Sequence, residues 1–148
     1  MRRLVLFDID GTILSTDGAA ARAFRRALEE VFGTSGPTHG YSFAGRTDPQ
    51  IARDLLTLAG VDRQRIERDL DRVWERYLGY LAAEFSSVRA RVFPGVRELI
   101  ELLRVEAGAL LGLLTGNVLE GARLKLKAAE IDEASFVVGA YGSDHADR

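Results

Sequence analysis

The feature that most restricts the fold of this chain is a short apolar run that ends in paired acids. Leu4 to Phe7 is continuously apolar, and Asp8-Ile9-Asp10-Gly11-Thr12 follows it directly. Such a run is typical of a strand covered on both faces, as in a parallel sheet. Side chains alternate along a strand, so Asp8 and Asp10 are expected to face one crevice. Because ligands of open α/β sheets bind beyond the carboxyl ends of the strands, we expect a site here.

The acids indicate what that site binds. Two neighbouring carboxylates repel each other and persist most easily with a cation or a shared proton between them. Gly11 allows close backbone approach, and its amide is a candidate donor to an anion. The same pattern is also ordinary turn chemistry after a strand, so the assignment depends on a second element.

A later strand and helix supply that element. Residues 109–114 (ALLGLL) predict a buried strand, and Thr115-Gly116-Asn117 turns into a helix that reaches about Glu130. A helix N-terminus binds phosphate through its free amides and its dipole. Residues 135–140 (SFVVGA) predict a third strand. These segments predict an α/β fold with a three-layer core built on a parallel sheet.

Between the first and second strands, the sequence reads as helices. Gly33 ends a first amphipathic stretch, and residues 33–47 form a long polar, glycine-rich loop of the kind that often carries function. Asp48-Pro49 predicts a helix start with Asp48 as the N-cap, and Asp62 predicts the start of a longer helix.

The helical block divides the chain. We assign residues 1–15 and 91–148 to the α/β core and residues 16–90 to a helical insertion. Trp74 and Tyr77 belong to the apolar stripe of the long helix and are expected to pack inside the insertion.

Composition excludes several classes of protein. The chain has 148 residues, no Cys and a net charge of -2, so it lacks thiolate metal sites and a basic field for nucleic acid. Its apolar runs reach only about six residues, far short of a membrane span. We therefore expect a cytoplasmic protein with neither a nucleic-acid nor a membrane partner.

Several segments together resemble a known family. LVLFDIDGTIL and LLTGN, separated by a helical insertion, are similar to the haloacid dehalogenase (HAD) superfamily of phosphohydrolases. GRTDPQI, residues 45–51, is similar to the phosphoglycolate-phosphatase-like branch. The resemblance implies a Rossmann-like core with a helical cap, and hydrolysis of a small phosphorylated metabolite similar to phosphoglycolate.

The resemblance also implies roles for the paired acids. Asp8 would attack phosphorus and form an aspartyl-phosphate, and Asp10 would act as general acid and then as general base. Mg²⁺ would bind the Asp8 carboxylate and the Asp10 main-chain carbonyl. Dehalogenating relatives would lack the second acid, so Asp10 favours phosphoryl transfer.

Further residues are implied in phosphate and substrate binding. Thr115 and the amides of Gly116 and Gly11 would hold the phosphoryl oxygens, and Arg46 and Thr47 would contact the rest of the substrate. The full phosphate-binding set that we expect is Gly11, Thr12, Thr115, Gly116 and Asn117.

The family also uses a basic residue beside the nucleophile. Lys125 and Lys127 lie two to three turns into the helix after Thr115, roughly 12–18 Å along its axis, so we expect both on a solvated surface. We instead predict that Arg148, which follows the third strand, has this catalytic role.

The C-terminal part departs from the family pattern. The family's fourth motif is an acidic pair after a further strand, whereas the acidic segment 142–147 comes one strand early. We therefore expect a truncated member, with an exposed sheet edge that is a possible contact for homo-oligomers.

Three alternatives stay open. A sugar-phosphate mutase uses the same core and differs in the cap. A catalytically impaired fragment would bind only phosphate or a partner. A phospho-accepting receiver fits less well, because it carries its phosphorylated Asp after a middle strand and has no helical insertion.

Overall fold

A three-stranded parallel sheet forms the base of the molecule. The computed structural model describes residues 3–105 and 109–145. Strands β1 (Arg3–Phe7), β4 (Ala109–Leu114) and β5 (Val138–Ala140) pair in the order β1-β4-β5. The register aligns Phe7 with Leu113, and Leu113 with Gly139. The predicted α/β, Rossmann-like fold class is confirmed.

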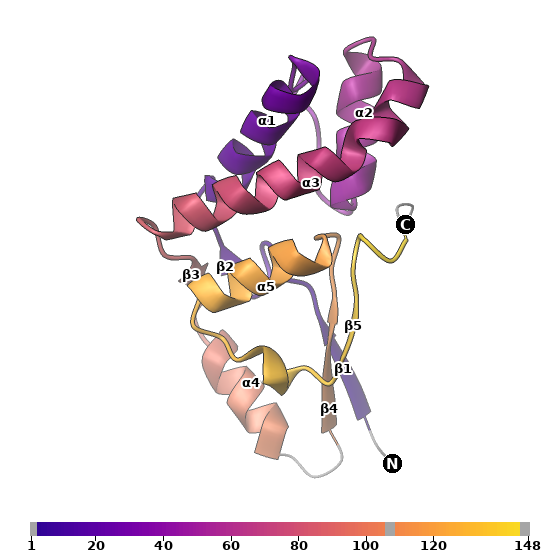
Figure 1. Ribbon diagram of the computed structural model, residues 1–148. Helices are drawn as coiled ribbons and strands as arrows, with labels where there is room; N and C mark the ends of the chain where they lie inside the picture. The colour runs from indigo at the N-terminus through magenta and orange to yellow at the C-terminus, as the bar shows by residue number, and fades with distance from the viewer. Residues whose placement is uncertain (1–2, 106–108, 146–148) are drawn as a thin grey trace.

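Helices cover one face of this sheet. α4 (Val96–Val105) and α5 (Leu119–Ala128) lie on the same side (Figure 1), and Ile100 and Leu126 pack with Phe7, Leu111 and Leu113. The side chains that alternate with these strand residues lie on the other face and are exposed: Leu4, Leu6, Leu110, Leu114 and Val138. The expectation that the first strand is buried on both faces is therefore wrong for the described residues.

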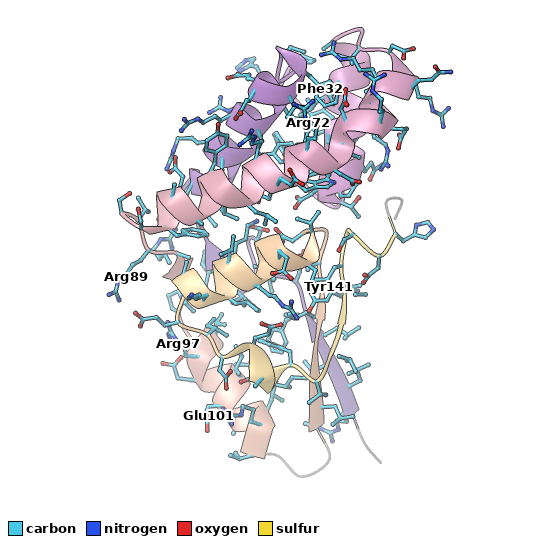
Figure 2. The ribbon with its side chains drawn as sticks, viewed as in Figure 1. Phe32, Arg72, Arg89, Arg97, Glu101 and Tyr141 are labelled. Carbon is cyan, nitrogen blue, oxygen red and sulfur yellow. The ribbon has the colours of Figure 1, made fainter. Side chains whose placement is uncertain are left out.

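A helical cap lies beyond the carboxyl ends of the strands (Figure 1). α1 (Ala19–Phe32), α2 (Asp48–Leu58) and α3 (Arg63–Phe85) enclose their own apolar cluster. In Figure 2, Phe32 lies in this cap, whereas Arg97 and Glu101 lie on α4 of the sheet half.

Two short strands connect the halves. β2 (Leu14–Ser15) and β3 (Arg91–Val92) pair antiparallel where the chain enters and leaves the cap. The expected boundaries, 15/16 and 90/91, fall beside these strands; the division into two domains stays a prediction.

The ends of several elements match local signals. Gly33 ends α1 with a φ of 78°, a conformation that glycine adopts without steric cost. Asp62 begins α3 by accepting a hydrogen bond from Arg65 N. The N-cap of α2 is Thr47 and not Asp48, because the Thr47 hydroxyl accepts from Gln50 N.

The third strand is shorter than predicted. Residues 133–135 form the 3-10 turn η1 (Glu133–Ser135), and pairing with β4 begins only at Val138. Within residues 3–105 and 109–145, no helix is both long enough and apolar enough to cross a membrane.

Candidate active site

A cavity of about 460 Å³ opens where the cap meets the carboxyl ends of the strands. Asp8 and Asp10 line it from the end of β1, and Thr115, Gly116 and Asn117 line it from the end of β4. The two predicted motifs, a hundred residues apart in sequence, therefore meet in one pocket.

Asp8 is held by its own backbone. Its Oδ1 accepts a hydrogen bond from Ile9 N at 2.8 Å, which fixes the carboxylate at the strand end. The described residues supply no hydrogen-bond partner for the second oxygen, Oδ2, which leaves it available to a ligand in the cavity.

Thr115 and Asn117 form a linked pair. Thr115 is buried, and its amide donates to Ala140 O at 3.0 Å, so the residue is tied to the sheet. Its Oγ1 accepts from Asn117 N and Nδ2 at 3.3 and 2.7 Å. Because the Thr115 oxygen accepts from these two donors, its own proton points away from them and can be donated to an anion.

Lys125 lies inside the site, which corrects the prediction of a solvated side chain. Only 3% of the residue is exposed, and its Nζ donates to both oxygens of Asp10 at 2.8 and 2.9 Å. A third bond at 2.5 Å reaches Asn117 Oδ1. The prediction for Lys127, which is exposed, is confirmed.

Distance along the helix misled the prediction. Lys125 lies six residues after Leu119, about 9 Å along α5. Helical side chains point back toward the N-terminus, so a long lysine covers much of that distance. Counting from Thr115 overestimated the gap, because residues 115–118 form a turn beside the site.

Anionic neighbours keep Lys125 charged. Burial lowers the pKa of this lysine, but coupling to Tyr77, Asp10 and Asp48 outweighs that effect and raises the pKa above its usual value. Burial, by contrast, raises the pKa of the Tyr77 phenol, so near pH 7 Tyr77 is neutral and adds no negative charge beside Lys125. The carboxylates therefore stabilise the ammonium at physiological pH.

Asp48 connects the cap to the N-terminal end of α5. Its backbone N–H donates to Gly116 O at 2.7 Å, and its Oδ2 accepts from Val118 N at 3.0 Å. The N-cap residue of α5, Val118, offers no capping side chain, so the Asp48 carboxylate accepts the hydrogen bond from its N–H instead. Burial raises the pKa of Asp48 to about 6, against the opposing effects of Lys125 and the Val118 N–H.

Two glycines have different roles. Gly11 has a φ of 77°, and its N–H donates to Leu14 O at 3.0 Å. This bond corrects the expectation that its amide holds phosphate. A Cβ on Gly116 would collide with the carbonyl oxygen of Arg46, so close cap–core packing requires glycine there.

Two other residues that we expected to contact the substrate, Thr12 and Thr47, do not line the cavity. Thr12 is exposed and is not among the lining residues, and its N–H donates to Ile9 O. Thr47 is buried as the N-cap of α2 and does not line the cavity either. The predicted ligand contacts of these two residues therefore have no support in the geometry.

Arg46 lines the cavity but is bound within the cap. Its Nη1 donates to Tyr41 Oη at 2.7 Å and pairs with Asp54 Oδ2 at 2.5 Å. Tyr41 also donates to Asp54 at 2.7 Å, which completes a three-residue cluster.

The C-terminal acidic segment builds a turn. Asp144 Oδ2 accepts from Tyr141 N, and Ser143 Oγ accepts from Leu119 N at the start of α5. Among the described residues, no group of three or more His, Cys, Asp or Glu side chains could hold a metal. Asp147 and Arg148, the predicted basic catalytic residue, lie outside the described residues.

Sequence reasoning missed the contributions of Lys125, Asp48 and Tyr77 to the site. For Lys125 a signal existed, because a cation on the inner face of the helix after Thr115 points toward the preceding turn. For Asp48 and Tyr77 there was no local signal, because Asp48 fits an ordinary helix start and Tyr77 fits the apolar stripe of a packed helix.

Comparisons with known proteins agree on the fold. The family model of haloacid dehalogenase-like hydrolases matches residues 5–145. A predicted phosphoglycolate phosphatase from Haemophilus somnus is 21% identical, with a TM-score of 0.64 over 95% of this chain and 63% of its own. CbbY from Rhodobacter sphaeroides, solved with phosphate, is 22% identical, with a TM-score of 0.62 over 100% of this chain and 67% of its own.

A third solved structure extends the same likeness. A hydrolase from Pseudomonas syringae is 18% identical, with a TM-score of 0.65 over 99% of this chain and 63% of its own. The chain thus spans about two thirds of the length of these structures, and no curated protein sequence matches it. Since the family model matches nearly the whole chain, this protein belongs to the haloacid dehalogenase-like hydrolases.

Proposed function

We propose that the chain is built to hydrolyse a small phosphate monoester through an aspartyl-phosphate on Asp8. The observation that carries the proposal is the shared cavity, in which Asp8, Asp10 and Thr115 meet at the N-terminal end of α5. Paired acids, a hydroxyl and a helix N-terminus in one pocket suit phosphoryl transfer, which depends on positioning and charge stabilisation.

In the first step, Asp8 Oδ2 attacks phosphorus. The bond between phosphorus and the ester oxygen breaks, and the leaving oxygen takes the proton of Asp10, which enters this step as the carboxylic acid, so that the alcohol is released. Lys125 and Asn117 contact the Asp10 carboxyl and hold its orientation toward the cavity. Thr115 Oγ1 and the Gly116 amide are the donors to the phosphoryl oxygens.

In the second step, water attacks the aspartyl-phosphate. Asp10, now ionised, accepts a proton from this water as the new oxygen–phosphorus bond forms. The bond between Asp8 and phosphorus breaks, which regenerates the Asp8 carboxylate and releases inorganic phosphate.

The donor set fits Mg²⁺. Magnesium is commonly bound by one or two carboxylates together with water and substrate phosphate. Asp8 would contribute its carboxylate and Asp10 its main-chain carbonyl, because Lys125 already occupies both Asp10 side-chain oxygens. When bound, the ion would offset the negative charge shared by nucleophile and phosphate.

The family resemblance suggests phosphoglycolate as a reference substrate. Residues 45–51 carry that resemblance, and one similar structure is described as a predicted phosphoglycolate phosphatase. Release of inorganic phosphate is the useful readout, because a mutase would isomerise its substrate without releasing phosphate.

The direct test is Asp8→Asn. In Mg²⁺ buffer with an aryl phosphate, we expect wild-type protein to release phosphate and Asp8→Asn to lose at least about 10³-fold in rate. Asp71→Asn, an exposed acid on α3, is the matched control and should keep wild-type activity. Equal rates for wild type and Asp8→Asn would refute the mechanism.

A further inference from the structure

The cavity has two chemically different ends. The sheet end is polar and carries the acids, Thr115 and Lys125. The cap end is formed mainly by apolar groups from α1, α2 and the preceding loop: Ala20, Ala21, Phe24, Phe43, Ala44 and Ile51. A phosphate seated at the sheet end would therefore leave the alcohol part of its ester against an apolar wall.

The charges at the cap end of the cavity disfavour a substrate that carries a second anionic group. The cations among the described lining residues are Lys125 and Arg46, and both are already paired, with Asp10 and Asp54 respectively. Asp48, also in the wall, adds a negative charge at neutral pH. A substrate carboxylate placed there would lose water without gaining a cation, which weakens binding.

The size of the cavity also bears on the substrate. About 460 Å³ lies within the range of pockets that enclose ligands of drug size, and a two-carbon acid would leave much of it empty. Phe43 is 42% exposed on the loop before α2, so it can increase its burial when an apolar group binds.

We propose that the preferred substrate is a phosphate monoester whose alcohol part is uncharged, largely apolar and about the size of a single ring. This inference rests on the proposed function and specifies its substrate class. The alcohol part would pack against Phe24, Phe43 and Ile51, and the neutral Tyr77 hydroxyl offers one polar group beside them.

Binding of two phosphonates tests the class without turnover. Benzylphosphonate carries an apolar ring, and phosphonoacetate carries the carboxylate of phosphoglycolate; neither can be hydrolysed. By isothermal titration calorimetry in Mg²⁺ buffer, we expect benzylphosphonate to bind at least about tenfold more tightly. Equal or tighter binding of phosphonoacetate overturns the inference, as does binding of neither.

Variants of the wall sharpen the test. Phe43→Ala should weaken benzylphosphonate binding about five- to tenfold and leave phosphonoacetate within about twofold. Ala21→Arg, exposed on α1, should shift the preference toward phosphonoacetate by about tenfold. Ala83→Arg, exposed on α3 away from the cavity, is the matched control and should change neither affinity. A Phe43→Ala protein with unchanged affinity for benzylphosphonate contradicts the inference.

Hydrolysis separates this inference from the function on which it rests. Benzyl phosphate and phosphoglycolate are both esters of aliphatic alcohols, so the ratio of their kcat/KM values reports recognition more directly than a comparison with an aryl ester does. We expect benzyl phosphate to be favoured at least about tenfold. Phosphate release that depends on Asp8 but favours phosphoglycolate refutes the substrate class alone. Release that is equal in wild type and Asp8→Asn refutes the proposed function.

Discussion

At the scale of single residues, Lys125 is the group that organises the site. Its three bonds orient the Asp10 carboxyl and fix Asn117, which in turn contacts Thr115. One buried ammonium therefore links the acid of the first motif to the hydroxyl of the second. Removing this ammonium should lower the free energy of unfolding, because its partners are partly buried and would lose their hydrogen bonds.

Lys125→Met should reduce both stability and activity. We expect the free energy of unfolding to fall by about 1–3 kcal/mol, since the Asp10 side chain is half exposed and can be rehydrated. Phosphate release should fall at least about 100-fold because Asp10 loses its orientation. Lys127→Met, on the exposed face of the same helix, should alter neither quantity. Urea unfolding and kcat measure the two effects, and matching values for both variants would contradict this role.

At the scale of elements, Asp48 at the start of α2 bonds the cap to the turn that precedes α5. Asp48 supplies both a backbone donor and a carboxylate acceptor to the turn at residues 116–118. Because the folded pKa of Asp48 is about 6, above its ordinary 3.8, folding stabilises the protonated form of Asp48 relative to the unfolded chain. Its contribution to stability is complete below pH 3.8 and is lost as the pH rises through about 6.

Asp48→Asn should reveal this pH dependence. Asparagine does not titrate, so the free energy of unfolding of wild type minus that of Asp48→Asn should fall by up to about 3 kcal/mol between pH 4 and pH 7. Glu67→Gln is the control, because a hydrogen bond from Arg53 lowers the pKa of Glu67. Its unfolding free energy should therefore differ from that of wild type by a constant amount above pH 5.5. Urea titrations at several pH values measure both, and a flat Asp48→Asn difference would exclude the raised pKa.

At the scale of the whole molecule, the bare face of the sheet is the largest departure from expectation. Leu4 and Leu6 on β1 and Val138 on β5 are each about half exposed, and these two strands flank β4. A contiguous apolar surface of this kind favours association. The homo-oligomer expected from the sequence would find its contact here and not only at the sheet edge.

Leu6→Lys should weaken self-association. A charge at the centre of the bare face must be desolvated when that face is covered, so we expect a lower weight-average mass at high protein concentration. Leu58→Lys places the same charge on an exposed leucine of the cap and should leave the mass unchanged. Sedimentation velocity over a concentration series measures the effect. A wild-type chain that stays monomeric throughout would show that this face does not self-associate.

Local patterns predicted the elements well, for identifiable reasons. The apolar runs at Leu4 and residues 109–114 formed strands because burial of one face was sufficient, and Asp62 and Gly33 marked helix ends through their own backbone bonds. The meeting of Asp8 and Thr115 was also predictable, because parallel strands bring their carboxyl ends to one edge. Local patterns did not predict the N-cap residue of α2, because the Asp48 carboxylate instead accepts from Val118, the residue before α5.

The amino-acid order by itself determined where the strands, turns and helices form and that two acids stand at the end of the first strand, because these depend on neighbours in the chain. Only the tertiary structure decided what those acids touch. The Asp10–Lys125 bond joins residues 115 positions apart, and the Asp48–Val118 bond joins residues 70 apart. The first contact arises from the packing of α5 against the sheet and the second from the packing of the cap against the core. A side chain that reads as a surface lysine thereby becomes the buried cation of the site.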